Sequence, residues 1–293
     1  MAHKSGFVNI IGNPNVGKST LMNALVGERL SIITSKAQTT RHRIMGIVNS
    51  DDFQIVYSDT PGVLKPSYKL QESMMRFVMS ALEDSDVILY ITDTQETPNK
   101  NEDFLETLRN QKVPIILVIN KIDLSNQADL EEKVALWKKL LPATAIIPAS
   151  ALHGFNLDTI LNAILAHLPE GPEYFDKETL TDRTLRFFAS EIIREKVLTT
   201  YQKEIPYSVE VEIEEYTEGE KIDRIRAILY VNRESQKGII IGHQGKNLKK
   251  VGTEARLELE NFLDKKVFLE LFVKVDSNWR DDDSKLKRFG YIQ

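Results

Sequence analysis

Apolar and polar positions divide the first part of the chain into short strands and amphipathic helices that alternate. The runs at residues 87–91 and 115–119 are continuous and apolar, which is typical of strands buried on both faces of a sheet. Between such runs, apolar residues recur three and four positions apart, as on one face of a helix. The expected strands are residues 7–11, 44–49, 54–58, 87–92, 115–119 and 145–148. The expected helices are residues 19–26, 70–82, 101–110, 130–140 and 157–168. This order predicts a doubly wound α/β domain with a mostly parallel sheet.

The pattern changes after residue 168, where two prolines and a glycine within residues 169–173 indicate a domain boundary. We expect a first domain at residues 1–170, a linker at 171–179 and a second domain at 180–293. The pattern of the second domain predicts a helix, two strands, two helices joined by a glycine loop, and a final strand. This order is typical of an α+β domain. Its expected elements are a helix at 180–201, strands at 207–216, 222–232 and 267–275, and a helix at 247–263.

Alternation within residues 207–216 predicts a strand buried on one face only. Val209, Val211 and Ile213 would point inward, and the glutamates between them would face solvent. In the preceding helix, the residues expected on one face are Leu185, Phe188, Ile192, Ile193 and Val197.

Composition narrows the class of protein without identifying a function. The chain has 293 residues, 42% of them hydrophobic, which is enough for two cores. There is no cysteine, so disulfides and thiolate metal sites are excluded. No secretory signal is visible at the start, and we expect a cytosolic protein. The formal net charge of −5 gives no global reason for nucleic-acid binding, so such binding requires a local basic patch.

Residues 12–19 read G-x-x-x-x-G-K-S, between an expected strand and an expected helix. Glycines let backbone N–H groups turn toward an anion, and the helix N-terminus adds its unpaired donors. Lys18 would reach the outer phosphates of a nucleotide, and Ser19 would bind Mg²⁺. The alternative is a glycine-rich turn, which leaves the adjacent Lys18 and Ser19 unexplained.

Three further motifs follow expected strands, at the strand ends where α/β folds bind ligands. After the third strand, Asp59 could hold Mg²⁺ through water and Gly62 could donate to a γ-phosphate, although Thr-Pro-Gly is also an ordinary turn. After the fifth strand, Asp123 could accept two hydrogen bonds from guanine, which adenine cannot offer. The alternative there is a helix cap. After the sixth strand, residues 150–152 could offer a backbone N–H to guanine O6.

The order of these motifs resembles the translation-factor-type GTPases with a P-loop G domain. The resemblance implies that Thr40, within Gln38-Thr39-Thr40-Arg41, binds Mg²⁺ in the GTP state. The residues expected to contact GTP are Gly12, Asn13, Pro14, Asn15, Val16, Gly17, Lys18, Ser19, Thr20, Asp59, Thr60, Pro61, Gly62, Asn120, Lys121, Ile122, Asp123, Ser150, Ala151 and Leu152. Those expected to hold Mg²⁺ are Ser19, Thr40 and Asp59. Those expected to act in hydrolysis are Asn15, Lys18, Thr40 and Gly62.

Two positions shape the expected hydrolysis. Val63 follows Gly62, where Ras-like enzymes carry a water-positioning glutamine, and an apolar side chain cannot orient water. We therefore expect slow intrinsic turnover. Asn15 matches the asparagine with which related GTPases coordinate K⁺, an ion that could supply positive charge to the transition state. The alternative for Asn15 is a turn residue that tolerates special backbone angles.

The second domain centres on the loop Gly242-His243-Gln244-Gly245, which is followed by Lys246. No acid occurs between residues 235 and 253, so this stretch is locally basic. In this order of elements the loop resembles that of a type II KH domain, a module for single-stranded RNA. The expected RNA contacts are Ile241, Gly242, His243, Gln244, Gly245, Lys246, Lys249 and Lys250. The alternative is a helical hairpin with a solvated lysine face.

Two neighbouring features bear on the extent of this site. The apolar residues Ile239, Ile240, Ile241 and Leu248 could line the base groove or belong to the core. We expect the C-terminal tail to be solvated and to extend the RNA site at most through Trp279 and Arg280, and we do not expect its acids at 281–283 to bind metal.

A P-loop G domain followed by a type II KH domain resembles the Era-like family of GTPases across the whole chain. The resemblance implies a GTP-hydrolysing switch that binds the 3′ end of small-subunit rRNA and acts in small ribosomal subunit assembly. It also implies a cytoplasmic protein, with peripheral contact at the inner membrane; we expect a monomer. Residues 31–43 and 61–73 would be ordered by GTP and would gate RNA binding. Two alternatives stay open at this point: a nucleotide-dependent phosphotransferase, and an RNA scaffold with a degenerate nucleotide site.

Overall fold

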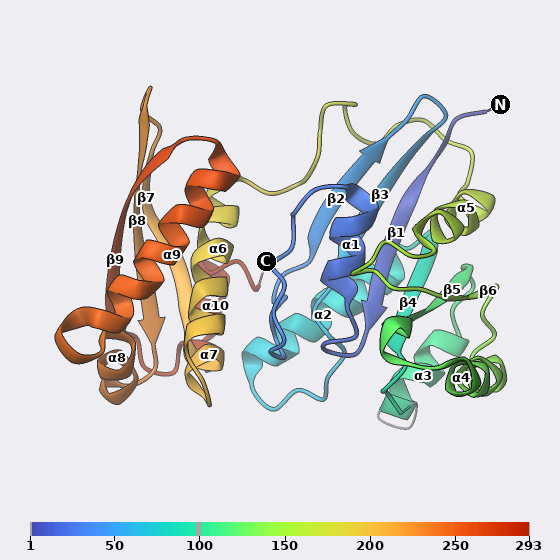
Figure 1. The fold of residues 1–293 in the computed structure, drawn as a ribbon, viewed down its shortest axis with the longest axis horizontal. Coiled ribbons are helices and arrows are strands. Elements are labelled where there is room, and N and C mark those ends of the chain that lie inside the picture. Colours follow the sequence, from blue (N-terminus) through green and yellow to red (C-terminus); the bar gives the residue numbers. More distant parts are fainter. Residues whose placement is uncertain (1, 98–100, 293) are drawn as a thin grey trace. The chain divides into compact units, whose positions relative to one another are not determined.

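The computed structural model describes residues 2–97 and 101–292. The chain forms two compact units, each with its own sheet (Figure 1). Each unit also has its own cluster of buried apolar side chains. The first unit comprises Met1–Ser67 and Gln71–Asp182, and the second comprises Tyr68–Leu70 and Arg183–Gln293. Within the described residues, no helix combines the length and the apolar character needed to cross a membrane.

The first unit contains a six-stranded sheet in the order β2-β3-β1-β4-β5-β6. Only β2 runs antiparallel to its neighbour, while the other pairs are parallel, as the sequence predicts. The strands are β1 (Lys4–Gly12), β2 (Ile44–Asn49), β3 (Phe53–Asp59), β4 (Val87–Asp93), β5 (Ile115–Asn120) and β6 (Ala145–Pro148). The helices are α1 (Lys18–Val26), α2 (Lys69–Glu83), α3 (Glu102–Arg109), α4 (Gln127–Leu140) and α5 (Leu157–His167), with a short 3-10 turn η2 (Ile122–Leu124).

Helices cover both faces of this sheet. On one face α2, α3 and α4 pack on β1, β4 and β5 through a single cluster of buried side chains. Every residue of β4 is buried, which explains why its sequence is continuously apolar rather than alternating. On the other face α1 and α5 pack against each other and against the strands. The doubly wound arrangement brings the loops after β1, β3, β5 and β6 to one edge of the sheet.

The segment after α5 runs back along the first unit instead of leaving it. The Ile47 N–H donates to Leu180 O (2.8 Å), and the Thr181 hydroxyl donates to Met45 O (2.6 Å). Farther back, the Gln54 amide donates to Phe175 O (2.8 Å). The segment therefore pairs with part of the free edge of β2, which would otherwise expose unpaired backbone groups. As a result the first unit extends to residue 182, beyond the boundary expected from the prolines.

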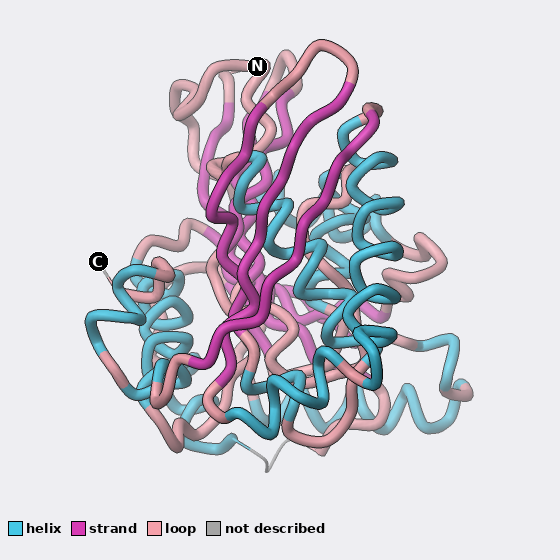
Figure 2. The backbone as a smooth tube through the Cα atoms, turned by 90° about the vertical axis from the view of Figure 1, so that its left-hand side faces the viewer, coloured by secondary structure: helices cyan, strands magenta, loops and turns pink. Residues whose placement is uncertain are grey.

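The second unit has a three-stranded sheet in the order β7-β8-β9, with β7 antiparallel and β9 parallel to β8 (Figure 2). Helices α6 and α9 cover its inner face, and the parallel connection from β8 to β9 passes through α8 and α9. The elements are α6 (Leu185–Thr200), α7 (Ile205–Ser208), β7 (Glu210–Thr217), β8 (Ile222–Val231), α8 (Glu234–Ile241), η3 (His243–Gly245), α9 (Lys246–Leu263), β9 (Lys266–Val275), η4 (Trp279–Asp281) and α10 (Asp283–Arg288).

Three expectations for this unit are wrong at particular positions. Helix α6 begins at Leu185 rather than at 180, because the preceding residues pair with β2, and Leu185 itself is 45% exposed. Residues 205–208 form the helix α7, with Pro206 in its first turn, so β7 starts later than expected. Glu210 is buried rather than solvated, since it accepts a hydrogen bond from the Tyr291 hydroxyl (2.8 Å).

The C-terminal tail is also not a solvated end. Trp279 has no exposed surface, and its indole N–H donates to Ser208 O (3.1 Å). Leu286 and Tyr291 are buried as well. The acid Asp282 caps α10 by accepting from the backbone N–H of Ser284 (2.9 Å). A buried indole offers no free face to a base, so the expected RNA contact through Trp279 is wrong.

Candidate functional site

The loop that connects β1 to α1 curls around a cavity of about 580 Å³ at the carboxyl edge of the first sheet. Gly17 has φ +99°, and a Cβ there would lie 2.2 Å from the Asn120 amide, so only glycine fits. The N-terminus of α1 follows directly, which leaves its unpaired N–H groups at the cavity. The cavity is lined by Pro14, Asn15, Gly17, Lys18, Ser19, Thr20, Ile32, Ile33, Thr34, Ser35, Lys36, Gln38, Thr39, Thr40, Gly62, Asn120, Lys121, Asp123, Leu124, Ser150 and Leu152.

Lys18 is buried at the base of this loop, where its ammonium donates to Asn13 O (2.9 Å). Burial lowers the pKa of Lys18 to about 8, although Asp59 and Glu96 oppose the shift. Because the ammonium lacks full hydration there, an anionic phosphate would be a favourable new partner for it.

Ser19, Thr40 and Asp59 form a cluster of oxygen atoms beside Lys18. The Ser19 hydroxyl lies 2.6 Å from Asp59 Oδ2 and 2.9 Å from the Thr40 hydroxyl, which itself lies 3.1 Å from Asp59 Oδ2. Burial raises the pKa of Asp59, while the Lys18 charge and the hydroxyl donors oppose that shift. The neighbouring Thr39 faces elsewhere, since its hydroxyl donates to Lys36 O (2.6 Å). The structure thus brings together the three residues expected to hold Mg²⁺.

The loops after β5 and β6 meet the loop after β1. The Asn120 amide donates to Val16 O (2.9 Å) and accepts from the Ala151 N–H (2.9 Å). The Ser150 hydroxyl donates to Asp123 Oδ1 (2.6 Å), which holds that carboxylate in one orientation at the cavity. The N–H of Ala151 is therefore already engaged with Asn120.

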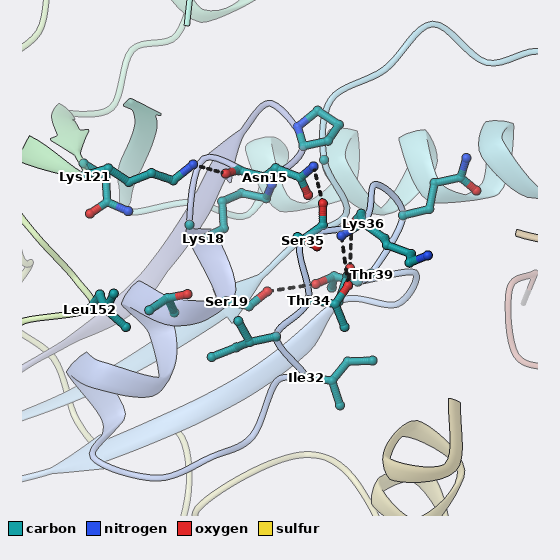
Figure 3. A pocket seen from close by; sticks show the side chains of 18 of the residues that line it. Asn15, Lys18, Ser19, Ile32, Thr34, Ser35, Lys36, Thr39, Lys121 and Leu152 are labelled. Atoms are coloured by element: carbon teal, nitrogen blue, oxygen red, sulfur yellow. Dashed lines mark hydrogen bonds between the residues drawn. The ribbon is translucent and has the colours of Figure 1, made fainter. Parts of the chain in front are cut away.

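Figure 3 shows Asn15 between the two sides of the cavity. Its backbone oxygen accepts from the Lys121 ammonium (2.5 Å), and its side-chain amide donates to Ser35 O (3.0 Å). Asn15 adopts φ +66°, so it also has the turn conformation that asparagine tolerates. Both interpretations of this residue are compatible with its geometry.

Several of the expected nucleotide residues lie outside the cavity lining. Asn13, Asp59 and Thr60 are buried, and the Thr60 hydroxyl donates to Ile10 O (2.8 Å). The other residues from the expected set that do not line the cavity are Gly12, Val16, Pro61, Ile122 and Ala151. Conversely, Leu124 and residues 32–36 line the cavity although they were not among the expected GTP contacts. Residues 32–36 belong to the loop 31–43 that was expected to be ordered by GTP, but no motif indicated which of its residues would face the nucleotide.

The glycine loop of the second unit joins α8 to α9. Gly242 has φ +70°, and a Cβ there would lie 2.6 Å from the Asn247 side chain. His243, Gln244, Lys246, Lys249 and Lys250 are exposed, while Ile241 and Gly245 are partly buried. The expected RNA residues are therefore mostly accessible.

A groove of about 380 Å³ lies beside this loop. It is lined by Gly245, Leu248, Lys249, Gly252, Thr253, Arg256, Leu269 and Leu271. Arg256 and the two β9 leucines were missed, although alternation along β9 marks those leucines as inward-facing. Among the apolar residues proposed for the groove, Ile240 belongs to the core with no exposed surface, and Ile239 is 48% exposed.

Together, the nucleotide-type cavity and the glycine-loop unit define a P-loop GTPase with a C-terminal KH domain. The family described as a 50S ribosome-binding GTPase matches residues 7–121, and the KH domain family matches residues 204–280. GTPase Era of Staphylococcus haemolyticus is 43% identical over 99% of this chain and 98% of its own length. GTPase Era of Staphylococcus epidermidis shows the same identity and coverage.

Two solved structures resemble the whole chain. A variant of Aquifex aeolicus Era bound to GDP and AlF4⁻ aligns with a TM-score of 0.94 and 41% identity, covering 99% of this chain and 100% of that one. Era in complex with MgGDPNP and nucleotides 1506–1542 of 16S ribosomal RNA aligns with the same scores and coverage. The chain therefore belongs to the Era family of GTPases, and its first unit is the G domain that hydrolyses GTP. The predicted family, fold class and enzymatic activity are confirmed.

Proposed function

We propose that this GTPase is a switch that binds the 3′ end of small-subunit rRNA and acts in assembly of the small ribosomal subunit. The observation that carries the proposal is the Ser19–Thr40–Asp59 cluster, which joins the phosphate loop, the loop before β2 and the end of β3. A γ-phosphate and its metal at this point would contact all three segments. Loss of the γ-phosphate would release the loop that carries Thr40.

The residues of the cluster fit a magnesium ion. All three supply oxygen, the donor that Mg²⁺ prefers, and Asp59 Oδ1 is buried without a hydrogen-bond donor among the described residues. Ser19 and Thr40 would bind the ion, and Asp59 would hold it directly or through water. When bound, Mg²⁺ neutralises charge on the β- and γ-phosphate oxygens. That Era is known in a complex with MgGDPNP supports this assignment.

Other residues would orient the nucleotide. Lys18 and the backbone N–H groups of residues 12–20 would bind the phosphates, and the Gly62 N–H would donate to the γ-phosphate. Asp123, held by Ser150, would accept from guanine N1–H and N2–H. The remaining residues of the expected GTP set would shape the loop rather than contact the nucleotide through their side chains.

Hydrolysis would be slow without a further source of positive charge, because Val63 offers no polar group to the attacking water. Asn15 could help to hold K⁺ at this point: turning its amide by half a rotation would direct Oδ1 toward Ser35 O, so that two oxygens face one cation. Hydrolysis rates in KCl and NaCl at equal ionic strength test this. Equal rates in both salts would exclude the K⁺ site.

RNA would bind along the glycine loop and the adjoining groove. Glycines at 242 and 245 allow a sugar–phosphate backbone to approach closely, and Lys246 and Lys249 supply charge beside the α9 N-terminus. The relative solved with nucleotides 1506–1542 of 16S rRNA supports the choice of ligand.

The first test is the affinity for a short RNA that copies this 3′ end, measured with a GTP analogue, with GDP and without nucleotide. We expect tight binding with the GTP analogue and weaker binding with GDP. Lys246→Glu should weaken binding in every state, whereas Lys221→Glu, an exposed lysine on another turn, should not. Equal affinity in all three states would contradict the switch, and loss of binding to the same extent in both variants would contradict the RNA site.

We also place the protein in the cytoplasm as a monomer with peripheral contact at the inner membrane. This part of the proposal is supported by the resemblance to the Era-like family alone. Gel filtration tests the oligomeric state, and a stable dimer would contradict the monomer. Cell fractionation tests the membrane contact, and finding all of the protein in the soluble fraction would contradict it.

A further inference from the structure

Arg43 lies at the junction between the loop that carries Thr40 and the strand β2. Its side chain is only 9% exposed, and the guanidinium makes hydrogen bonds to β1, to β3 and to the turn that follows α2. Nη1 and Nη2 donate to Asp84 Oδ2 and Oδ1 (2.5 and 3.0 Å), Nη2 also donates to Asn9 Oδ1 (2.9 Å), and Nε donates to Ser58 Oγ (3.1 Å). A buried guanidinium with so many partners has one permitted position.

The partners of Arg43 lie on one face of the sheet, beneath α2. Asn9 and Ser58 are opposite each other in the β1–β3 register, and β3 separates β1 from β2 in the sheet (Figure 1). Asn9 has no exposed surface and donates to Ala81 O (2.8 Å) and Ser85 Oγ (2.9 Å). Asp84 directly follows α2, the helix that begins after residues 61–68.

These contacts hold the chain in place next to Asp59 and next to Thr40, the two residues that interact at the metal site. Ser58 is the residue before Asp59, and Thr40 is three residues before Arg43, a span of at most about 11 Å of chain. All four residues from Thr40 to Arg43 are buried. The position of the Thr40 hydroxyl beside Asp59 therefore depends on where Arg43 anchors the chain.

We propose that Arg43 is a positioning residue for the GTP state, which acts by holding Thr40 at the metal site. GTP binding with Mg²⁺ uses Thr40, whereas GDP binding does not, so the anchor should favour GTP over GDP. The bidentate pair with Asp84 also ties this anchor to the end of α2. The inference rests on the proposed role of Thr40.

The test compares affinities for a GTP analogue and for GDP in the full chain at saturating Mg²⁺. Arg43→Lys keeps the charge and loses the planar bidentate contact. We expect it to weaken analogue binding about tenfold more than GDP binding, within the range of ordinary coupling between sites. Asp84→Asn should shift the ratio in the same direction. In a Thr40→Ala background, Arg43→Lys should change the ratio no further.

A matched control separates this role from a merely structural one. Arg194 in the second unit is also buried and makes a bidentate pair, with Nε and Nη2 donating to Glu191 (2.7 and 2.6 Å). Arg194→Lys should lower stability without changing the analogue-to-GDP ratio. Parallel loss of affinity for both nucleotides in Arg43→Lys would overturn the proposal. If Thr40→Ala itself leaves the ratio unchanged, the assignment of Thr40 fails instead, and with it the proposed metal site.

Discussion

At the scale of single residues, burial decides what several side chains can do. Val63 follows the Asp-Thr-Pro-Gly motif, but only 4% of it is exposed, and it packs in the core with Ile11 and Val78. Its backbone N–H donates to Gly12 O (3.0 Å), and Val63 is not among the residues that line the nucleotide cavity. The apolar residue is therefore part of the core beneath the phosphate loop.

Replacing Val63 by glutamine should lower stability without raising the rate of hydrolysis. The amide would be buried among apolar side chains without a partner, which costs about 1–3 kcal/mol. Urea unfolding and single-turnover hydrolysis measure the two effects. Met79→Gln, at a position 41% exposed on α2, introduces the same group at little cost and serves as the control. Faster hydrolysis at native stability would mean that the side chain can reach the attacking water.

At the scale of elements, the C-terminal segment completes the second unit. Trp279 packs edge-on against Phe289 (ring centroids 5.7 Å apart), and Arg288 lies over the Tyr230 ring (5.0 Å). The tail thereby covers Tyr230 of β8, which also packs against Phe289 and is 5% exposed. Short helices such as α10 gain their stability from this packing rather than from propensity.

Truncating Trp279 should destabilise the second unit selectively. Trp279→Ala removes a fully buried indole, and we expect a loss of about 3–5 kcal/mol. Calorimetry of the full chain measures it, with Trp137→Ala as the matched control, because Trp137 is 1% exposed in the core of the first unit. A drop in RNA affinity without any loss of stability would instead favour a solvated tail that contacts RNA.

At the scale of the whole molecule, two separate hydrophobic cores imply two unfolding transitions. The buried cluster around α6, β8 and α9 shares no residue with the cluster around β1, β4 and α3. A saturating guanine nucleotide should raise the midpoint of only the transition that belongs to the first unit. At a hundredfold excess over the dissociation constant, the gain is about 2.7 kcal/mol. Scanning calorimetry with and without GDP measures this. A single unfolding transition whose midpoint rises with GDP would contradict the expectation that the two units unfold separately.

The sequence by itself determined the strands and helices of the first unit to within a few residues and most of the side chains at the nucleotide cavity. The physical reason is local: burial on both faces makes strands continuously apolar, and parallel strands present their ends at one edge. Motifs at those ends, such as the one that contains Asp123, therefore lie close to one another. This does not depend on how the individual side chains pack.

Only the tertiary structure decided where α6 begins, that Glu210 accepts from Tyr291, and that Trp279 is buried. Each depends on hydrogen bonds or packing between residues far apart in the chain, whose partners are unknown until the topology is built. The network around Arg43 is of the same kind. From the sequence, an arginine just before an edge strand is expected to be exposed to solvent. Only the hydrogen bonds of Arg43 to Asn9 and Asp84 show that it anchors the chain.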